Sequence, residues 1–146
     1  MFKRLTERSR RVMAMTTQAA IERSDPVLRP EHLLLAMARE GSGVGAAVLT
    51  RLGVNLAGVA ESLDAWLPRN VPGEPAEFPL KQLKTVIESA IAEARDLGHL
   101  YIGTEHLLLG LVLASGDGRA REIFAQNSIT PEVARAGVLT VLAANR

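Results

Sequence analysis

Two glutamate–histidine pairs are the residues of this sequence best suited to chemistry. Glu31-His32 and Glu105-His106 stand 74 positions apart, and each is followed by three leucines, so Glu-His-Leu-Leu-Leu occurs twice in 146 residues. A carboxylate can bind a guanidinium group through two hydrogen bonds, and an imidazole can move a proton or ligate a metal. Recurrence at half the chain length predicts a duplicated folding unit.

A metal site is the less favoured interpretation of the histidines. His32 and His106 belong to different copies, and no Glu-x-x-His or His-x-x-x-His spacing places two ligands on one helix face. We therefore expect no metal and no cofactor. We expect His32 and His106 to be packed, each with a ring nitrogen bonded to the carbonyl of a neighbouring loop.

The sequence also lacks the usual patterns of an enzyme. It has no cysteine, no Gly-x-Ser-x-Gly elbow and no Walker-type phosphate loop. We therefore expect a non-catalytic chain that does not hydrolyse ATP by that mechanism.

Charge and hydropathy indicate a cytoplasmic protein that binds neither nucleic acid nor membrane. The net charge is +1 and aromatic residues make up 3% of the chain, which leaves little for phosphate attraction or base stacking. The basic start, from Lys3 to Arg11, is interrupted by Glu7 and is typical of a solvated helix face. No apolar run approaches the roughly 20 residues that span a bilayer.

Helical periodicity and capping signals predict an all-α fold of eight helices in two copies of four. We place copy 1 at residues 1–67, a proline-rich linker at 68–79 and copy 2 at 80–146. Helices are expected over residues 6–23, 30–39, 46–52, 56–67 and 80–97, then from Thr104 as a cap, from Asp117 or Gly118, and from Thr130-Pro131. After Gly116 the offset between copies becomes 75. Both copies should pack as one pseudo-symmetric body.

The apolar residues of the motif should form the core, because three consecutive leucines on a helix imply burial around much of its circumference. Trp66 is expected to cover the edge of that core. Alternatively, Trp66, Val71 and Phe78 border an apolar groove for partner peptides.

Three stretches together resemble a known family: residues 2–8, the turn at 39–43 and, above all, the run from Glu93 to Leu111 with its Gly103-Thr104-Glu105-His106 core. They are similar to the double Clp repeat, the N-terminal domain of unfoldases of the ClpC and ClpA types. The resemblance covers residues 2–142. It implies a domain that binds protein substrates or adaptor proteins. These would belong to a Clp unfoldase and peptidase system, which acts in proteolysis or as a chaperone. An AAA+ ATPase ring would belong to any longer parent protein.

The resemblance also implies a ligand, the phosphorylated arginine that tags proteins for degradation. Carried over, Glu31 and Glu105 would bind its guanidinium side. Thr6, Arg8, Lys81 and Thr104 are candidates for the phosphate side. The alternatives are structural: each glutamate complements its own helix dipole, Thr6 is a cap, and Arg8 is solvated.

Copy 1 departs from the family pattern, because it reads Arg29-Pro30-Glu31-His32 in place of Gly-Thr-Glu-His. The guanidinium group of Arg29 could itself pair with the carboxylate of Glu31, in place of a ligand. In copy 2, Pro79-Leu80-Lys81 replaces the usual Thr-Pro-Arg. We therefore expect unequal sites, with Glu105 the better candidate. The competing function is a free-standing regulator that docks on a Clp unfoldase or protease and competes with its N-domain.

Overall fold

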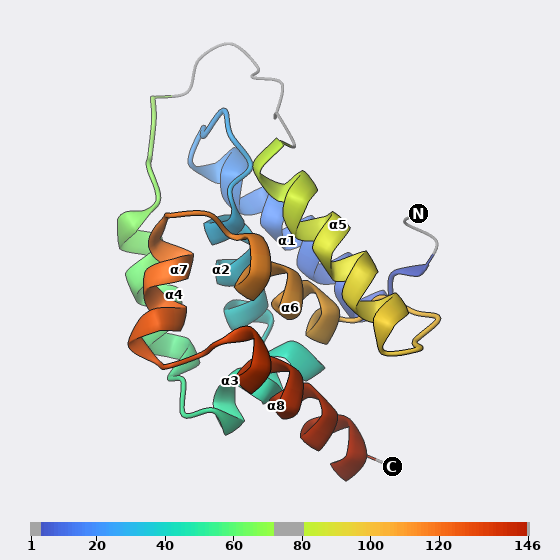
Figure 1. Ribbon diagram of the computed structural model, residues 1–146. Helices are drawn as coiled ribbons and strands as arrows, with labels where there is room; N and C mark the ends of the chain where they lie inside the picture. Colours follow the sequence, from blue (N-terminus) through green and yellow to red (C-terminus); the bar gives the residue numbers. More distant parts are fainter. Residues whose placement is uncertain (1–3, 72–80, 146) are drawn as a thin grey trace.

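A computed structural model describes residues 4–71 and 81–145, and for residues 81 and 82 it describes the backbone alone. Within these residues the regular elements are all helices, as predicted (Figure 1). They are α1 (Glu7–Glu22), α2 (Pro30–Glu40), α3 (Val44–Arg51), α4 (Leu56–Trp66), α5 (Lys81–Asp96), α6 (Thr104–Ala114), α7 (Arg119–Gln126) and α8 (Pro131–Ala144). The limits of the proline-rich linker stay a prediction, since residues 72–80 lie outside the described part.

Three helices begin at N-caps whose side chains accept backbone hydrogen bonds. The Thr6 hydroxyl accepts from the Ser9 amide at 3.1 Å, the Asn55 side chain accepts from the Gly58 amide at 3.1 Å, and Thr130 accepts from the Val133 amide. Each satisfies a donor that the first turn of a helix leaves without an intrahelical partner.

The predicted cap of α6 is wrong. Gly103 is the N-cap, and Thr104 is the first helical residue. The imidazole of His106 accepts from the Gly103 amide instead, and the Thr104 hydroxyl accepts from an amide of α3. His32 and the Arg29 amide make the same contact at the start of α2. Histidine at the third helical position thus fills the place that glutamate or glutamine takes in an ordinary capping box.

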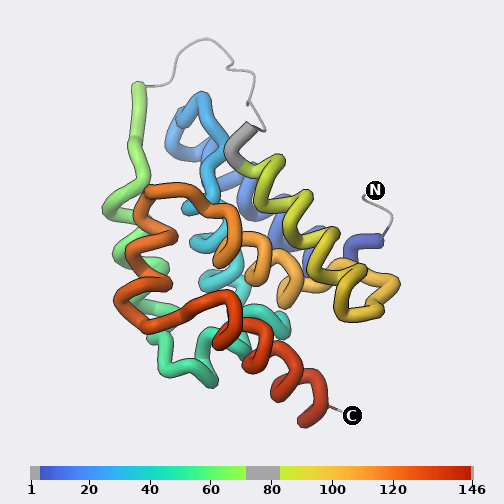
Figure 2. Tube along the Cα trace, in the orientation of Figure 1, coloured from blue at the N-terminus to red at the C-terminus, as the bar shows by residue number. Residues whose placement is uncertain are grey.

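The two sets of four helices pack around a central pair. α2 and α6 lie in the middle, α1 packs on α2, and α5 packs on α6. The short helices cross over: α3 contacts α6 and α8, whereas α7 contacts α2 and α4. The contacts of α3 with α6 and α8 thus match those of α7 with α2 and α4, as expected of two pseudo-symmetric copies, whose paths along the chain Figure 2 traces.

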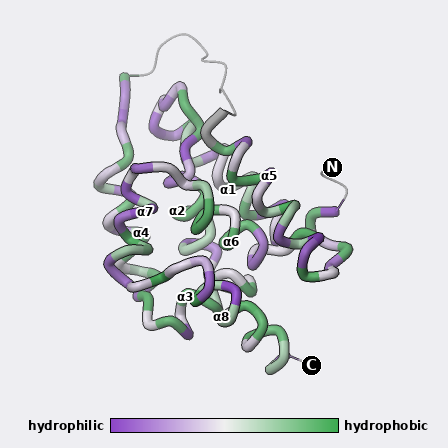
Figure 3. Tube along the Cα trace, viewed as in Figure 1, coloured by the Kyte–Doolittle hydropathy of each residue, from purple (hydrophilic) through white to green (hydrophobic). Residues whose placement is uncertain are grey.

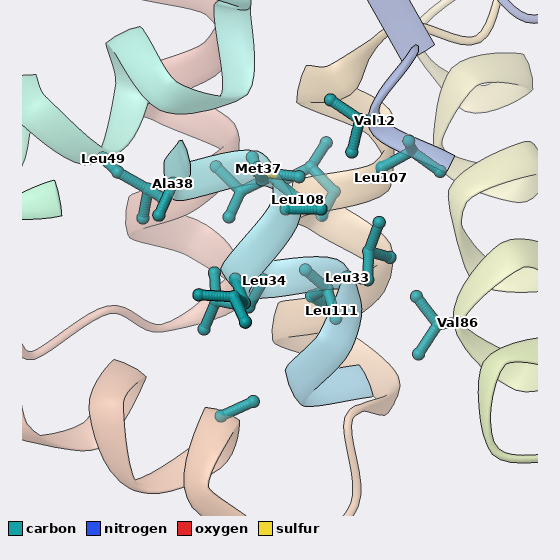
Figure 4. Packing of buried hydrophobic residues seen from close by; sticks show 14 of the residues in the cluster. Val12, Leu33, Leu34, Met37, Ala38, Leu49, Val86, Leu107, Leu108 and Leu111 are labelled. Carbon is teal, nitrogen blue, oxygen red and sulfur yellow. The ribbon is translucent and has the colours of Figure 1, made fainter. Parts of the chain in front are cut away.

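The leucines of both motifs form the core, as predicted. Leu33, Leu34 and Leu35 and their counterparts Leu107, Leu108 and Leu109 are at most 1% exposed. Figure 4 shows leucines of α2 and α6 gathered with Val12 of α1, Val86 of α5 and Leu49 of α3. The flanking α5 alternates hydrophobic and hydrophilic residues along its trace (Figure 3), because only one of its faces is buried.

One glycine sets how closely α5 and α6 approach. A Cβ added to Gly110 would lie 2.3 Å from the Val86 carbonyl oxygen and 3.1 Å from the Ala90 nitrogen, both on the α5 backbone. The position therefore excludes a side chain unless the two helices separate.

The N-terminal segment joins the second copy through a contact that helical periodicity does not reveal. Leu5 and Ile102 form an isolated parallel bridge. The Thr6 amide donates to the Ile102 carbonyl at 3.0 Å, and the Ile102 amide donates to the Arg4 carbonyl at 2.8 Å. The start of α1 is thereby fixed beside the loop that leads into α6.

No single helix in the described parts of the chain is both long and apolar enough to cross a membrane. The bent pair α2 and α3 meets the length and composition test only when the two are taken together.

Candidate functional site

Glu31 lies in the first turn of α2 and is 3% exposed. Its Oε2 accepts a hydrogen bond from the Ala120 amide at 2.9 Å, across 89 residues of sequence. Ala120 is in the first turn of α7, so the carboxylate caps a helix of the other copy. A carboxylate has about four lone-pair positions, and one amide leaves acceptor capacity for a ligand.

Glu31 also lines a cleft of about 470 Å³. Its other lining residues include Trp66 at the end of α4, Thr85 of α5 and the loop from Ala114 to Gly118. A Cβ on Gly118 would lie 2.6 Å from Glu31 Oε2, so this loop approaches the carboxylate as closely as it does because residue 118 is glycine. The cleft joins an aromatic side chain, a carboxylate and a loop backbone in one hollow.

Arg29 lines the same cleft, but its guanidinium group pairs with Asp25. Arg29 Nε donates to Asp25 Oδ2 at 2.8 Å and Nη2 to Oδ1 at 3.3 Å. Asp25 is buried, and the His32 ring packs against it with Nε2 3.4 Å from Oδ2. The alternative that Arg29 pairs with Glu31 is therefore wrong, because the carboxylate of Asp25 binds and neutralises the Arg29 guanidinium group.

Glu105, the counterpart of Glu31, has different surroundings. It is 2% exposed, and the Tyr101 hydroxyl donates to its Oε2 at 3.2 Å. Burial raises the pKa of the Glu105 carboxyl above its ordinary value, while hydrogen bonds from its own backbone amide and from Tyr101 oppose that rise. Burial and the neighbouring Glu105 charge also raise the pKa of Tyr101.

Thr104 takes over in copy 2 the capping task that Glu31 performs in copy 1. Its hydroxyl accepts from the Gly45 amide, in the first turn of α3, at 2.9 Å. The matching position in copy 1 is Pro30, which has no hydroxyl, and there the next residue, Glu31, reaches the matching helix. The same structural need is met by different residues, and this breaks the symmetry of the two sites.

Arg8 lies beside this contact. Its Nη1 donates to the Ser42 carbonyl at 2.8 Å, and a Cβ on Gly43 would meet both the Thr104 side chain and Arg8 Cδ. Arg8 Nε also lies 3.8 Å from Glu40 Oε1. Thr104 and Arg8 therefore both lie beside Gly43, and their assignment to a phosphate side stays a prediction. Thr6 is engaged as the cap of α1, and the Lys81 side chain lies outside the described residues, so its assignment stays a prediction.

The histidines are packed, but their predicted hydrogen-bond partner is wrong. His32 Nδ1 accepts from the Arg29 amide and His106 Nδ1 from the Gly103 amide, both at 2.9 Å, so each ring bonds a loop amide rather than a carbonyl. His106 Nε2 also lies 2.8 Å from His99 Nδ1. Burial lowers the pKa of both His32 and His106 to about 4. Among the described residues, no three histidine, aspartate or glutamate side chains gather as a metal site needs.

The apolar groove suggested for Trp66, Val71 and Phe78 is only partly described. Trp66 is 43% exposed and borders the mixed cleft at Glu31, and Val71 is 90% exposed. Phe78 lies outside the described residues. Sequence reasoning missed the cleft's other residues, including Thr85 and Asp117, because nothing in their local pattern distinguishes them from ordinary surface positions.

Comparison with known proteins decides the family. The family model of the Clp repeat (R) N-terminal domain matches residues 4–127 and 78–144. The chain belongs to the Clp repeat N-terminal domain family. Over 145 residues it is 34% identical to the negative regulator of genetic competence ClpC/MecB of Bacillus subtilis and, equally, to the chaperone protein ClpB of Oceanobacillus iheyensis. Each alignment includes 99% of this chain and 18% of the relative, so the Clp repeat domain spans under a fifth of either protein.

Solved structures agree with the fold. The N-domain of ClpV from Vibrio cholerae superposes with a TM-score of 0.82 at 15% identity, over 97% of this chain and 87% of that one. The N-terminal domain of ClpD from Arabidopsis thaliana gives 0.72 at 23% identity, over 97% and 99%. A complex of a ClpV N-domain with a VipB peptide gives 0.75 at 18% identity, over 96% and 89%.

Proposed function

We propose that this Clp repeat domain is a non-catalytic receptor for protein substrates or adaptors of a Clp-type unfoldase or protease. The observation that carries the proposal is the cleft at Glu31, which offers a carboxylate, an exposed aromatic ring and loop backbone to a peptide. The VipB peptide bound by a ClpV N-domain supports peptide binding as a use of this fold.

The finer part of the proposal is recognition of phosphoarginine. The carboxylates of Glu31 and Glu105 would take the guanidinium side, since charge-assisted pairing with a carboxylate is strong and directional. Arg8 with Thr104, and Lys81 and Thr6, would serve the phosphate side. Glu31 borders a cleft, whereas Glu105 is held by Tyr101, so the Glu31 site is the one we would test first.

Calorimetry with free phosphoarginine tests this ligand. The informative variant is Glu31→Gln, because the amide oxygen of glutamine still accepts from the Ala120 amide while the charge needed for a guanidinium group is removed. Glu105→Gln tests the second site in the same way. Glu132→Gln, an exposed first-turn residue of α8, is the matched control.

We expect saturable binding that Glu31→Gln weakens by about tenfold or more, while Glu132→Gln leaves it unchanged. Absence of binding at millimolar phosphoarginine, or equal affinity in all variants, would rule this ligand out. The broader receptor role would then be tested with unmodified client peptides.

The competing role, a regulator that docks on an unfoldase, has its own test. A tagged Clp repeat domain mixed with a purified ClpC-type ATPase ring and with a client protein should bind the client if it is a receptor. Binding to the ring alone, with displacement of the ring's own N-domain, would establish the regulator instead.

A further inference from the structure

Three arginines converge on one carboxylate at the side of the molecule formed by α1, α2 and α4. Asp64 Oδ1 accepts from Nη2 of Arg23, of Arg39 at 3.3 Å and of Arg69 at 3.0 Å. Arg23 is buried and also donates to the Ala19 carbonyl, and its Nε is buried without a partner in the described structure. Arg39 and Arg69 are 41% and 60% exposed.

This arginine cluster carries more positive charge than its acids neutralise. Asp64 and the nearby Glu22 give two negative charges against the three guanidinium groups. Each guanidinium has five N–H donors in a rigid fork, and Arg39 and Arg69 each use one of them on Asp64. The exposed forks of Arg39 and Arg69 are therefore available to an additional carboxylate.

The fold does not need this cluster, as the second copy shows. At the positions that match Arg23, Arg39 and Asp64, copy 2 has Leu97, Leu113 and Leu139. Leu113 and Leu139 are themselves substantially exposed. One copy of the repeat therefore has leucines, two of them exposed, where the other has an ionic group with surplus positive charge, so helix packing alone does not account for the arginines.

An apolar groove begins at Arg39. A hollow of about 150 Å³ runs between α1 and α2, and Arg39 is one of its lining residues. It is also lined by Met15, Ala19, Leu35 and Ala36, and by the exposed residues Gln18 and Glu22. The volume suits one aliphatic side chain, and a polypeptide that leaves the groove at Arg39 reaches Asp64 and Arg69.

We propose that this surface, the α1–α2 groove with Arg39 and Arg69, docks an acidic peptide segment. An aliphatic side chain of the peptide lies in the groove, and a neighbouring glutamate or aspartate bonds the two exposed guanidinium groups beside Asp64. The surface uses no residue of the cleft at Glu31. It is a second contact for a protein partner, independent of phosphoarginine recognition.

Titration with two fluorescent peptides of equal length tests the proposal. One alternates glutamate with leucine, and the other alternates lysine with leucine. The diagnostic variant combines Arg39→Leu with Arg69→Leu, which leaves the pair of buried Arg23 and half-buried Asp64 intact. The control combines Arg10→Leu with Arg51→Leu, exposed residues outside this surface that change the net charge equally. Thermal unfolding verifies that both double variants fold.

The acidic peptide should bind saturably and more weakly as salt is added, and the diagnostic variant should lose about tenfold in affinity. Amide signals of Ala19 and Ala36 should shift in the NMR spectrum of the complex. Equal losses in both double variants, tight binding of the lysine peptide, or shifts confined to the cleft at Glu31 would each overturn the proposal. Glu31→Gln should leave this binding unchanged, which keeps it separable from the receptor site.

Discussion

Glu31 Oε2 lies 2.9 Å from the amide nitrogen of Ala120, so a residue suited to ligand binding is also the cap of a distant helix. The carboxylate is acceptor-only when ionised, and the first turn of α7 presents amides that need an acceptor. Any ligand that draws this carboxylate toward itself competes with the start of α7. If the cleft binds a ligand as proposed, that binding and the position of α7 are linked.

Glu31→Ala should destabilise the fold by about 1–3 kcal/mol, because the buried amide of Ala120 loses its acceptor. Urea unfolding measures the loss, and hydrogen exchange of the Ala120 amide should accelerate. Glu31→Gln should recover most of the stability through its amide oxygen. If alanine and glutamine destabilise equally, the hydrogen bond is not what matters at this position.

Thr104→Val should cost about 1–2 kcal/mol, since valine keeps the shape of threonine but leaves the Gly45 amide without its acceptor. Thr104→Ser, which keeps the hydroxyl, is the matched control and should stay close to the parent chain in urea unfolding. A valine variant as stable as the serine variant would contradict the assigned cap of α3.

Stability should rise with pH between about 4 and 6.5. Burial lowers the pKa of His32 and His106 to about 4 in the folded chain, against about 6.5 when unfolded, so the unfolded state binds more protons in this window. At the acid end of this window the free energy of unfolding falls by on the order of 3 kcal/mol per histidine. The raised pKa of Glu105 offsets part of this fall, because the folded state binds the proton of that carboxyl more readily than the unfolded state. Urea unfolding at several pH values gives the slope.

His106→Asn isolates one contribution to that slope. The asparagine oxygen can accept from the Gly103 amide but does not titrate, so the variant should have a flatter profile below pH 6.5. His99→Asn is the comparison, as His99 is only half-buried. A slope unchanged by His106→Asn would show that the proton uptake comes from other groups.

Gly110→Ala should destabilise by about 1–3 kcal/mol, because the new Cβ would collide with the backbone of α5 at Val86 and Ala90. Gly58→Ala, in an exposed helical position, should instead gain up to about 1 kcal/mol from helix propensity. Thermal unfolding of both variants, with opposite shifts in Tm, checks the pair. A shift of the same sign in both would show that α5 can move away from α6 at little cost.

Local patterns predicted the helices well, because each pattern is contained in a few neighbouring residues. Thr6, Asn55 and Thr130 are caps within three residues of the amides they accept from, and the leucine triplets mark burial directly. The family resemblance placed Glu31 and Glu105 at matching helix starts. These features need no knowledge of how the copies face each other.

The partners of the site residues could not be predicted in the same way. Thr104 is polar and stands at the start of a helix, so its local pattern predicts a cap of that helix, but its partner Gly45 is 59 residues away. The arginine cluster brings together side chains from three parts of the chain: the end of α1, α2, and α4 with the residues that follow it. Its surplus positive charge is visible only once Asp64 is seen between the arginines. Such contacts depend on the docking of one copy against the other or on the way one copy folds back on itself.

The bridge between Leu5 and Ile102 has a consequence for dividing the protein. A cut between α4 and α5 would not yield two self-sufficient halves. The front piece would lose Ile102, which bridges to Leu5, and the Thr104 hydroxyl, which accepts from the Gly45 amide of α3. The rear piece would lose Glu31, the cap of α7. Expressed as two polypeptides, the halves should be poorly structured alone and recover the native fold when mixed. The two copies would then behave as two subunits that fold only together.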